Sequence, residues 1–173
     1  MIKGLRAKTT ETDRGYKKFK ENMKALEKGS YVKVGFPVEE EENKTVRGKG
    51  GEIVTSSDLT VAAVATFNEF GTDKIPERSF IRAGINEKLT EIKAFIEGQR
   101  GELLMGSIAG ALGRIGTLGQ NIIQKKIQSM QDPANAPSTV LRKGSSHPLI
   151  DTGQMVQSVR YVVVLDGEKP GEG

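Results

Sequence analysis

The chain has 173 residues, of which 36% are hydrophobic, 28% charged and only 5% aromatic. A chain of this size buries roughly 70% of its unfolded surface, so it fits one domain with an aliphatic, helix-rich core. Without Cys it can form neither disulfides nor thiolate metal sites. Its formal net charge of +4 is spread among interleaved acids, which argues against a dedicated nucleic-acid-binding protein.

The first expected elements are a helix and a strand. Thr12 and Asp13 stand where an N-cap belongs, ahead of apolar residues that recur every three or four positions, namely Tyr16, Phe19, Met23 and Leu26. Gly29 ends this helix. Apolar and polar residues then alternate over residues 31–36, which predicts a half-buried strand that Pro37 ends.

Residues 38–58 form a long polar segment with strand character only over residues 52–55. Its charged residues are Glu39, Glu40, Glu41 and Glu42, followed by Lys44, Arg47 and Lys49. Structureless segments of this length are uncommon inside compact domains and are usually functional or disordered. We interpret the segment as an extended hairpin or arm that leaves the body, and the alternative is a solvated loop.

Two helices are expected over residues 58–98. Asp58 is expected to cap a short helix that ends near Gly71. Pro76 forces an extended connection, and a second helix begins near Ser79. The apolar face of this second helix consists of Ile81, Ile85, Leu89, Ile92 and Ile96. The glycines at 98 and 101 mark a kink or a turn.

A third helix is expected from about residue 102 to residue 130. Glycines recur within it every three or four residues, at Gly106, Gly110, Gly113, Gly116 and Gly119. Each glycine costs up to about 1 kcal/mol relative to Ala in a helix interior. We therefore expect a neighbouring helix or strand to approach the backbone of this helix closely.

The remaining residues predict a loop, a short helix and a strand. Residues 131–148 are rich in loop-forming residues, and Asp151 or Thr152 is expected to cap a helix that runs through Ser158. The β-branched residues of 159–165 predict a strand, followed by a flexible polar tail over residues 166–173. The expected fold is α+β, with a small mixed or antiparallel sheet formed by residues 31–36, the arm strands and residues 159–165, packed by two or more long helices.

The sequence does not predict catalysis, a metal site or a cofactor. His147, the single His, lies in a loop without a Ser and acid pair at a suitable spacing. Residues 39–42 are consecutive acids rather than acids spaced to converge on one metal ion. Residues 113–119 lack the spacing of a dinucleotide-binding or phosphate-binding loop. We expect a protein that is not an enzyme, has no membrane span and carries no secretory signal.

Two short segments, residues 67–82 and 148–155, combine apolar anchors, turn residues and charges at helix boundaries. Glu69 and Arg78 bracket a tight connection, so we expect them to pair. Arg82 lies in a first helical turn, where a cation opposes the helix dipole, and is expected to reach a carboxylate on another element or subunit. The aromatic residues expected to fasten this connection to the core are Phe67, Phe70 and Phe80.

These motifs resemble the neck or tail-completion proteins of tailed bacteriophages, which join head to tail, and the related Mu-like virion morphogenesis proteins. The resemblance covers about residues 60–165. It rests on Asn-Glu-Phe-Gly-Thr at 68–72, Ile-Pro-Glu-Arg-Ser-Phe at 75–80, Arg-Ile-Gly at 114–116, residues 133–139, and Leu-Ile-Asp-Thr-Gly-Gln-Met at 149–155 with Ser158. The family commonly has Pro where Ser79 stands here, and residues 39–51 are not part of the shared pattern.

The resemblance implies a virion subunit, made in the host bacterial cytoplasm, that forms a ring, usually a hexamer, at the head-proximal end of the tail. Its partners would be further copies of itself, head-proximal neck proteins and the tail tube protein. DNA would at most pass through the ring lumen. The residues that would hold the fold and the ring contacts are Glu69, Phe70, Gly71, Arg78, Phe80, Arg82, Asp151 and Gly153. Because the arm over residues 38–58 is expected to protrude, and not because of the resemblance, we expect it to lie at a subunit or lumen contact.

The alternative is a basic nucleic-acid-binding module with no role in a ring. Its contacts would come from Lys44, Arg47, Lys49, Lys125, Lys126, Arg142 and Lys143. Binding of this kind falls steeply with rising salt concentration. Within the virion interpretation, a tail terminator, a head–tail joiner and an assembly factor all remain open.

Overall fold

A computed structural model describes residues 13–37, 43–47 and 53–165, with only the backbone for residues 43–47 and 53–59. Its fold is α+β, as the sequence predicts. The elements are, in chain order, α1 (Tyr16–Glu27), β1 (Tyr31–Gly35), β2 (Asn43–Arg47), β3 (Ile53–Thr60), α2 (Val61–Phe70), α3 (Phe80–Glu87), α4 (Leu89–Gly98), α5 (Arg100–Met105), α6 (Ile108–Ser129), α7 (Pro137–Lys143), α8 (Gln154–Gln157) and β4 (Arg160–Val164).

The described strands form two separate antiparallel pairs. β1 pairs with β4, with Tyr31 opposite Val164, and β2 pairs with β3 in a hairpin. The prediction that the arm strands join the sheet of β1 and β4 is therefore wrong. A hairpin closes over a short connection, which costs less chain entropy than recruiting β4 from a distant part of the sequence.

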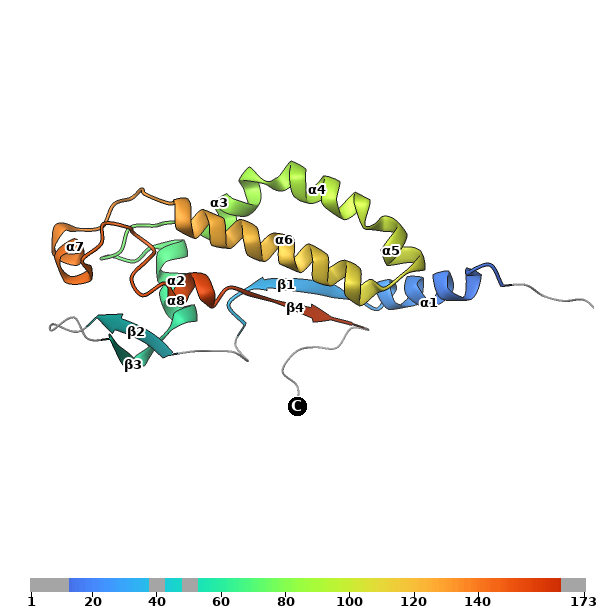
Figure 1. Ribbon diagram of the computed structural model, residues 1–173, viewed down its shortest axis with the longest axis horizontal. Helices are drawn as coiled ribbons and strands as arrows, with labels where there is room; N and C mark the ends of the chain where they lie inside the picture. The colour runs from blue at the N-terminus through green and yellow to red at the C-terminus, as the bar shows by residue number, and fades with distance from the viewer. Residues whose placement is uncertain (1–12, 38–42, 48–52, 166–173) are drawn as a thin grey trace, which may run out of the picture.

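Helix α6 packs along the sheet of β1 and β4 (Figure 1). A Cβ atom built on Gly116 would lie 2.5 Å from Cδ2 of Tyr161 and 2.9 Å from Cγ2 of Val32. A Cβ atom on Gly119 would lie 3.1 Å from Cγ2 of Val34. The close backbone approach predicted from the glycines is confirmed at these two positions, where a side chain would push the helix off the sheet.

The main core lies where α2, α3, α6 and α8 meet the start of β4. Its buried members are Val61, Ala65, Phe80, Ile123, Ile127, Leu149, Met155 and Val159. They are aliphatic apart from one ring, as the composition predicts. Phe36, which follows β1, meets the ring of Phe80 edge-on with the ring centroids 6.3 Å apart, an arrangement that aromatic pairs favour.

Several helix boundaries differ from those predicted. β3 continues through residue 58, so Thr60 rather than Asp58 caps α2, with its hydroxyl accepting a hydrogen bond from the N–H of Ala63 (3.2 Å). The long helix expected from residue 102 is interrupted at Gly106, whose backbone leaves the helical region. α6 then begins after Ser107, which accepts a hydrogen bond from the N–H of Gly110 (3.1 Å).

Other boundaries are closer to the prediction. α1 begins at Tyr16, and Asp13 accepts a hydrogen bond from the N–H of Gly15 (2.9 Å) ahead of it. The expected loop over residues 131–148 contains α7, which begins with proline, a residue suited to the first helical position. The helix expected from Ser79 has an additional break at Lys88, which divides it into α3 and α4. The turn expected at the glycines is confirmed, since α4 ends at Gly98 and α5 begins at Arg100.

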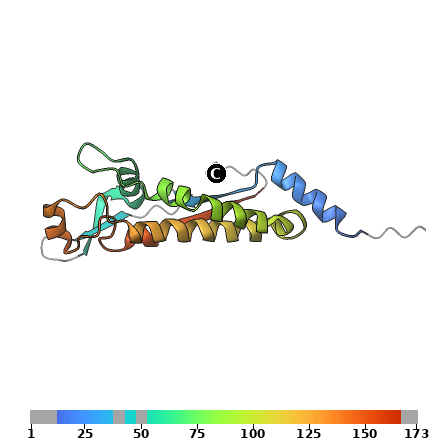
Figure 2. The same ribbon diagram turned by 90° about the horizontal axis from the view of Figure 1, so that it is seen from above.

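The molecule is elongated, with α1 at one end and the β2–β3 hairpin and α7 at the other (Figure 1). Seen from above, α1 again leaves the body at the end opposite the hairpin (Figure 2). α1 packs mainly against α5, and the hairpin packs against α2. No helix in the described part of the chain is both long and apolar enough to cross a bilayer.

Candidate functional site

The joint between α2 and α3, residues 68–82, carries most of the predicted site residues. Gly71 ends α2 with φ of 74°, in the left-handed region that favours glycine. A Cβ atom at this position would lie 3.0 Å from the backbone nitrogen of Glu77. Thr72 and Ile75 exchange backbone hydrogen bonds of 2.8 and 3.3 Å. These features make the connection a closed turn that requires glycine at its first position.

Glu69 caps α3 although it belongs to the preceding helix. The N–H of Ile81 donates to Oε2 (2.8 Å), the N–H of Arg82 donates to Oε1 (3.0 Å), and the hydroxyl of Ser79 also donates to Oε1 (3.1 Å). Ser79 occupies the N-cap position but makes no capping hydrogen bond of its own. The carboxylate thus satisfies N–H groups of the first turn and lies at the positive end of the helix dipole.

Glu69 pairs with Arg82, so the predicted pair of Glu69 with Arg78 is wrong. Nε of Arg82 lies 3.0 Å from Oε1 of Glu69, and Nη2 donates to the backbone carbonyl of Glu69 (2.8 Å) and to Oε1 of Glu77 (2.8 Å). Side chains of a helix lean toward its N-terminus, which directs Arg82 back to the carboxylate that caps it. The prediction that Arg82 reaches a carboxylate on another element is confirmed.

The hydrogen bonds keep the buried carboxylate ionised. Glu69 is only 3% exposed, and burial alone raises its pKa. The backbone N–H groups of Ile81 and Arg82, with the Arg82 and Ser79 side chains, more than offset that effect, so the pKa of Glu69 lies below its ordinary value. The hydrogen bond that Arg82 donates to Glu69 raises the pKa of Arg82 in turn.

Arg78 fastens the joint to the connection that follows α6. It is 5% exposed, and its Nε donates to the carbonyl of Pro133 (2.7 Å) while Nη2 donates to the carbonyl of Ala134 (3.0 Å). Nη1 donates to Oδ1 of Asn68 (3.1 Å). Among the side chains that the structure describes, no carboxylate pairs with Arg78, and burial lowers its pKa. Its forked guanidinium therefore links segments that are distant in the sequence.

The three phenylalanines of the joint do not share one role. Phe80 is fully buried, whereas Phe67 is 37% and Phe70 is 63% exposed, so the prediction that all three anchor the joint in the core is wrong for two of them. The buried face of α2 instead carries Val61, Ala65, Asn68 and Glu69. Phe70 stacks under the guanidinium of Arg82, 4.9 Å from the ring centroid.

Phe70 and Arg82 border a shallow pocket beside the joint. The pocket has a volume of about 280 Å³, and its lining also includes Phe36, Thr66 and Ile81. Apolar side chains dominate this lining, and its charged groups are already paired with each other. The pocket therefore offers a contact surface with a stacked arginine at its edge.

The second predicted segment closes on the same core. Gly153 has φ of 81° and stands immediately before α8, and Asp151 is half-buried in the same turn. Leu149 and Met155 on either side of this turn are buried in the cluster that contains Phe80. The two motifs of the sequence thus meet in one core, although about 70 residues separate them along the chain.

The predicted arm residues are only partly placed. Lys44 and Arg47 lie on β2, whose side chains are not described. Residues 39–42 and Lys49 fall outside the described residues. The sequence indicated one short strand in this segment, and the structure has two, β2 and β3, which pair with each other. The hairpin interpretation is therefore confirmed for the described backbone.

Sequence reasoning missed the part played by Asn68. Asn68 is buried, its Nδ2 donates to the carbonyl of Val64 (2.8 Å), and its Oδ1 accepts from Arg78. The sequence did carry a signal for this role, because Asn68 is a polar residue on the apolar face of a largely hydrophobic helix. A buried amide needs hydrogen-bond partners. His147, expected to have no role, has Nε2 2.7 Å from the carbonyl of Gln128.

The described residues include no group of three or more His, Asp or Glu side chains placed to hold a metal ion. Comparisons with protein-family models, with curated proteins and with solved structures find no match to this chain. What the protein does is therefore inferred from its motifs and from the geometry of the joint and of the two ends.

Proposed function

We propose that this protein is a structural subunit of the neck of a tailed bacteriophage. Copies of it form a ring, a hexamer by resemblance, at the head–tail junction, where the ring completes the tail and joins it to the head. The motifs that carry the resemblance support this proposal, because residues 68–80 and 149–155 meet in one core. The protein belongs to the virion and is made in the host cytoplasm.

The observation that carries the proposal is the position of the outlying elements. α1 and the β2–β3 hairpin leave the body at opposite ends (Figures 1 and 2). A closed ring of identical subunits requires two different surfaces on each copy, which meet head to tail. An elongated subunit with one projecting element at each end has the form that such a contact needs.

The joint supports a structural role rather than catalysis. The carboxylate of Glu69 accepts hydrogen bonds from two backbone N–H groups and from Arg82, and Arg78 donates to carbonyl and amide oxygens. Groups engaged in this way fix the angle between two helices and have little capacity left to bind and release protons. We propose that the joint keeps each subunit rigid within the ring.

Deleting residues 40–56 tests the ring assignment. The deletion removes most of the hairpin but leaves the core elements, so helicity measured by circular dichroism should persist while assembly measured by sedimentation velocity is lost. Lys93→Glu on the exposed face of α4 is the control, since it changes charge without touching either end. Unchanged assembly of the deletion variant would refute the assignment of the hairpin to a subunit contact.

The exact neck role can be determined by electron microscopy of phage particles assembled without this protein. Tails longer than normal would indicate a tail terminator, because the tube then lacks a stop. Tails of normal length that are detached from heads would indicate a joiner. An assembly factor would be indicated if complete particles formed only when the protein was supplied during assembly and yet did not contain it.

Nucleic-acid binding is a second candidate, favoured by one observation. Six of the seven basic residues proposed for it lie on β2, α7 and the C-terminal end of α6, and these three elements are at the same end of the molecule (Figure 1). Two of these residues are already engaged, since Lys126 pairs with Glu87 and Lys143 donates to the carbonyl of His147. Binding to duplex DNA that weakens steeply with salt would support this function, and no binding at low salt would remove it.

A further inference from the structure

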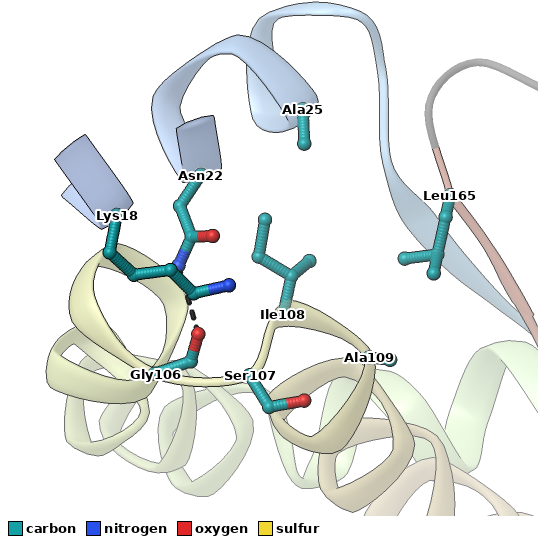
Figure 3. Close-up of a pocket in the computed structure, with 8 residues that line it drawn as sticks. All are labelled: Lys18, Asn22, Ala25, Gly106, Ser107, Ile108, Ala109 and Leu165. Carbon is teal, nitrogen blue, oxygen red and sulfur yellow. Dashed lines mark hydrogen bonds between the residues drawn. The ribbon is translucent and has the colours of Figure 1, made fainter. Parts of the chain in front are cut away.

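A groove lies at the α1 end, between α1, the start of α6 and the end of β4 (Figure 3). Its volume is about 490 Å³. Ala25, Ile108, Ala109 and Leu165 supply apolar lining, and Lys18 stands at one side. Figure 3 shows the side chains of Lys18 and Ile108 directed toward the same open space.

Asn22 holds the walls of this groove in place. It is buried, and its Nδ2 donates to the carbonyls of Leu103 (3.1 Å) and Gly106 (3.0 Å) at the C-terminal end of α5. Carbonyl groups at a helix end lack partners within the helix, so these hydrogen bonds tie α1 to α5. The groove is therefore a fixed feature of the fold.

Helix α1, which forms one side of the groove, also carries Glu21 and Glu27 but is basic on balance. The exposed lysines of this helix and its C-cap are Lys18, which lines the groove, and Lys17, Lys20, Lys24 and Lys28, which are not among the lining residues. Within the described residues none of them forms an ion pair. An apolar floor beside unpaired ammonium groups suits an extended segment that has an apolar side chain followed by several carboxylates.

The sequence contains one segment with that chemistry, Pro-Val-Glu-Glu-Glu-Glu at residues 37–42, which includes the longest acidic run in the chain. The segments at the two ends of the chain fit less well. Residues 1–8 carry Lys3, Arg6 and Lys8, which the lysines of α1 would repel. Residues 166–173 are acidic in part, but their only apolar side chain is that of Pro170.

This segment cannot reach the groove of its own copy. Tyr31 lies opposite Val164 near the groove, and Pro37 lies about 20 Å further along the direction of β1. Asn43 is also held at the far end, opposite Thr60 at the start of α2. Reaching the groove and returning would require about 40 Å, whereas the six links from Pro37 to Asn43 span at most about 21 Å.

We propose that the groove beside α1 binds residues 37–42 of a second copy, with Val38 against the apolar floor and the glutamates facing Lys18 and the neighbouring lysines. The groove and the acidic segment lie toward opposite ends of one copy, so the contact is head to tail and can repeat around a ring. This contact rests on the proposed ring and identifies the surfaces that join adjacent subunits.

Charge reversal on each side of the contact is the test. Lys18→Glu, and separately the combined change of residues 39–42 to Lys, should each weaken self-association at least tenfold in sedimentation velocity at low salt, with unchanged circular dichroism. A mixture of the two variants should associate more tightly than either alone. The intact acidic segment of the first then meets the intact groove of the second, which no contact within one chain would produce.

Two further variants distinguish a specific contact in the groove from a general effect of net charge on self-association. Ala109→Phe fills the groove without changing charge and should weaken association as Lys18→Glu does. Lys93→Glu makes the same charge change on α4, away from the groove, and should associate like the wild type.

The results that would overturn the groove contact differ from the result that would overturn the ring proposal. Wild-type association in both Lys18→Glu and Ala109→Phe would overturn this contact and leave the ring proposal standing. The contact would also be overturned if Lys18→Glu reduced binding to duplex DNA while leaving self-association unchanged. A wild-type chain that stays at 18.8 kDa at every concentration would instead remove the ring proposal itself.

Discussion

The joint between α2 and α3 differs from the two ends of the molecule in whether charged side chains are buried and hydrogen-bonded or exposed to solvent. At the joint, Glu69 and Arg78 are buried and hydrogen-bonded to several partners each. At the α1 end, Lys18 is exposed at the side of an open, largely apolar groove. The joint thus contributes to folding of the single copy, while the ends hold the surfaces available to other copies. Changes at the joint should lower stability, and changes at the ends should alter assembly.

The largest expected effect is that of Glu69→Ala. The substitution leaves the first turn of α3 uncapped and Arg82 without its buried partner, so the free energy of unfolding should fall by about 3 kcal/mol. Denaturant unfolding followed by circular dichroism measures this change. Glu77→Ala removes the exposed partner of the same arginine and should cost less than about 1 kcal/mol. Equal losses in the two variants would contradict the capping role of Glu69.

The packing of α6 on the sheet gives the next largest effect. Gly116→Val would force its side chain into Tyr161 and Val32, so we expect a loss of about 2 kcal/mol and a lower melting temperature. Gly98→Ala is the control, because nothing lies within 4 Å of a Cβ atom there. It should be neutral or stabilise by up to about 1 kcal/mol. A tolerated valine at residue 116 would show that α6 does not pack as described.

Arg78→Lys should have a smaller effect. An ammonium group cannot reach the carbonyls of Pro133 and Ala134 and the amide of Asn68 together, so we expect a loss of about 1–2 kcal/mol. Limited proteolysis should also cut residues 131–136 faster, because this connection loses its attachment to the joint. Arg100→Lys on an exposed helix surface is the matched control and should change neither quantity. Unchanged cutting in Arg78→Lys would argue against the attachment.

The smallest expected effect is a pH dependence at the joint. Because the folded-state pKa of Glu69 is below its ordinary value, its contribution is complete above the unfolded pKa and is lost as pH falls through the folded pKa. The difference in unfolding free energy between the wild type and Glu69→Gln should therefore shrink on acidification. Denaturant titrations at neutral and acidic pH measure it. A difference that stays constant would show that the carboxylate does not act in its ionised form.

Some of these features could be predicted from the sequence. The repeated glycines predicted close packing of α6, because glycine in a helix interior requires an explanation, and Gly116 and Gly119 confirm it. Alternation of residues predicted β1, and the β-branched run predicted β4. Such features depend on local pattern, which the sequence carries directly.

Other features depend on contacts that local pattern does not contain. Arg78 and Arg82 are both close to Glu69 along the chain, and the direction of α3 decides which one pairs with it. The partners of Arg78 at residues 133–134 lie more than 50 residues away in sequence. The exposure of Phe70 likewise depends on which face of α2 meets the core. These outcomes are set by tertiary packing, so no pattern of residues predicted them.

The most direct test of the division between joint and ends is the oligomeric mass of the wild type, of the variant lacking residues 40–56 and of Glu69→Ala, measured by sedimentation equilibrium below the unfolding transition. We predict a mass several times 18.8 kDa for the wild type and for Glu69→Ala, and a single subunit with normal helicity for the deletion variant. A wild type that remains one subunit at every concentration, or a deletion variant that still assembles, would contradict this account.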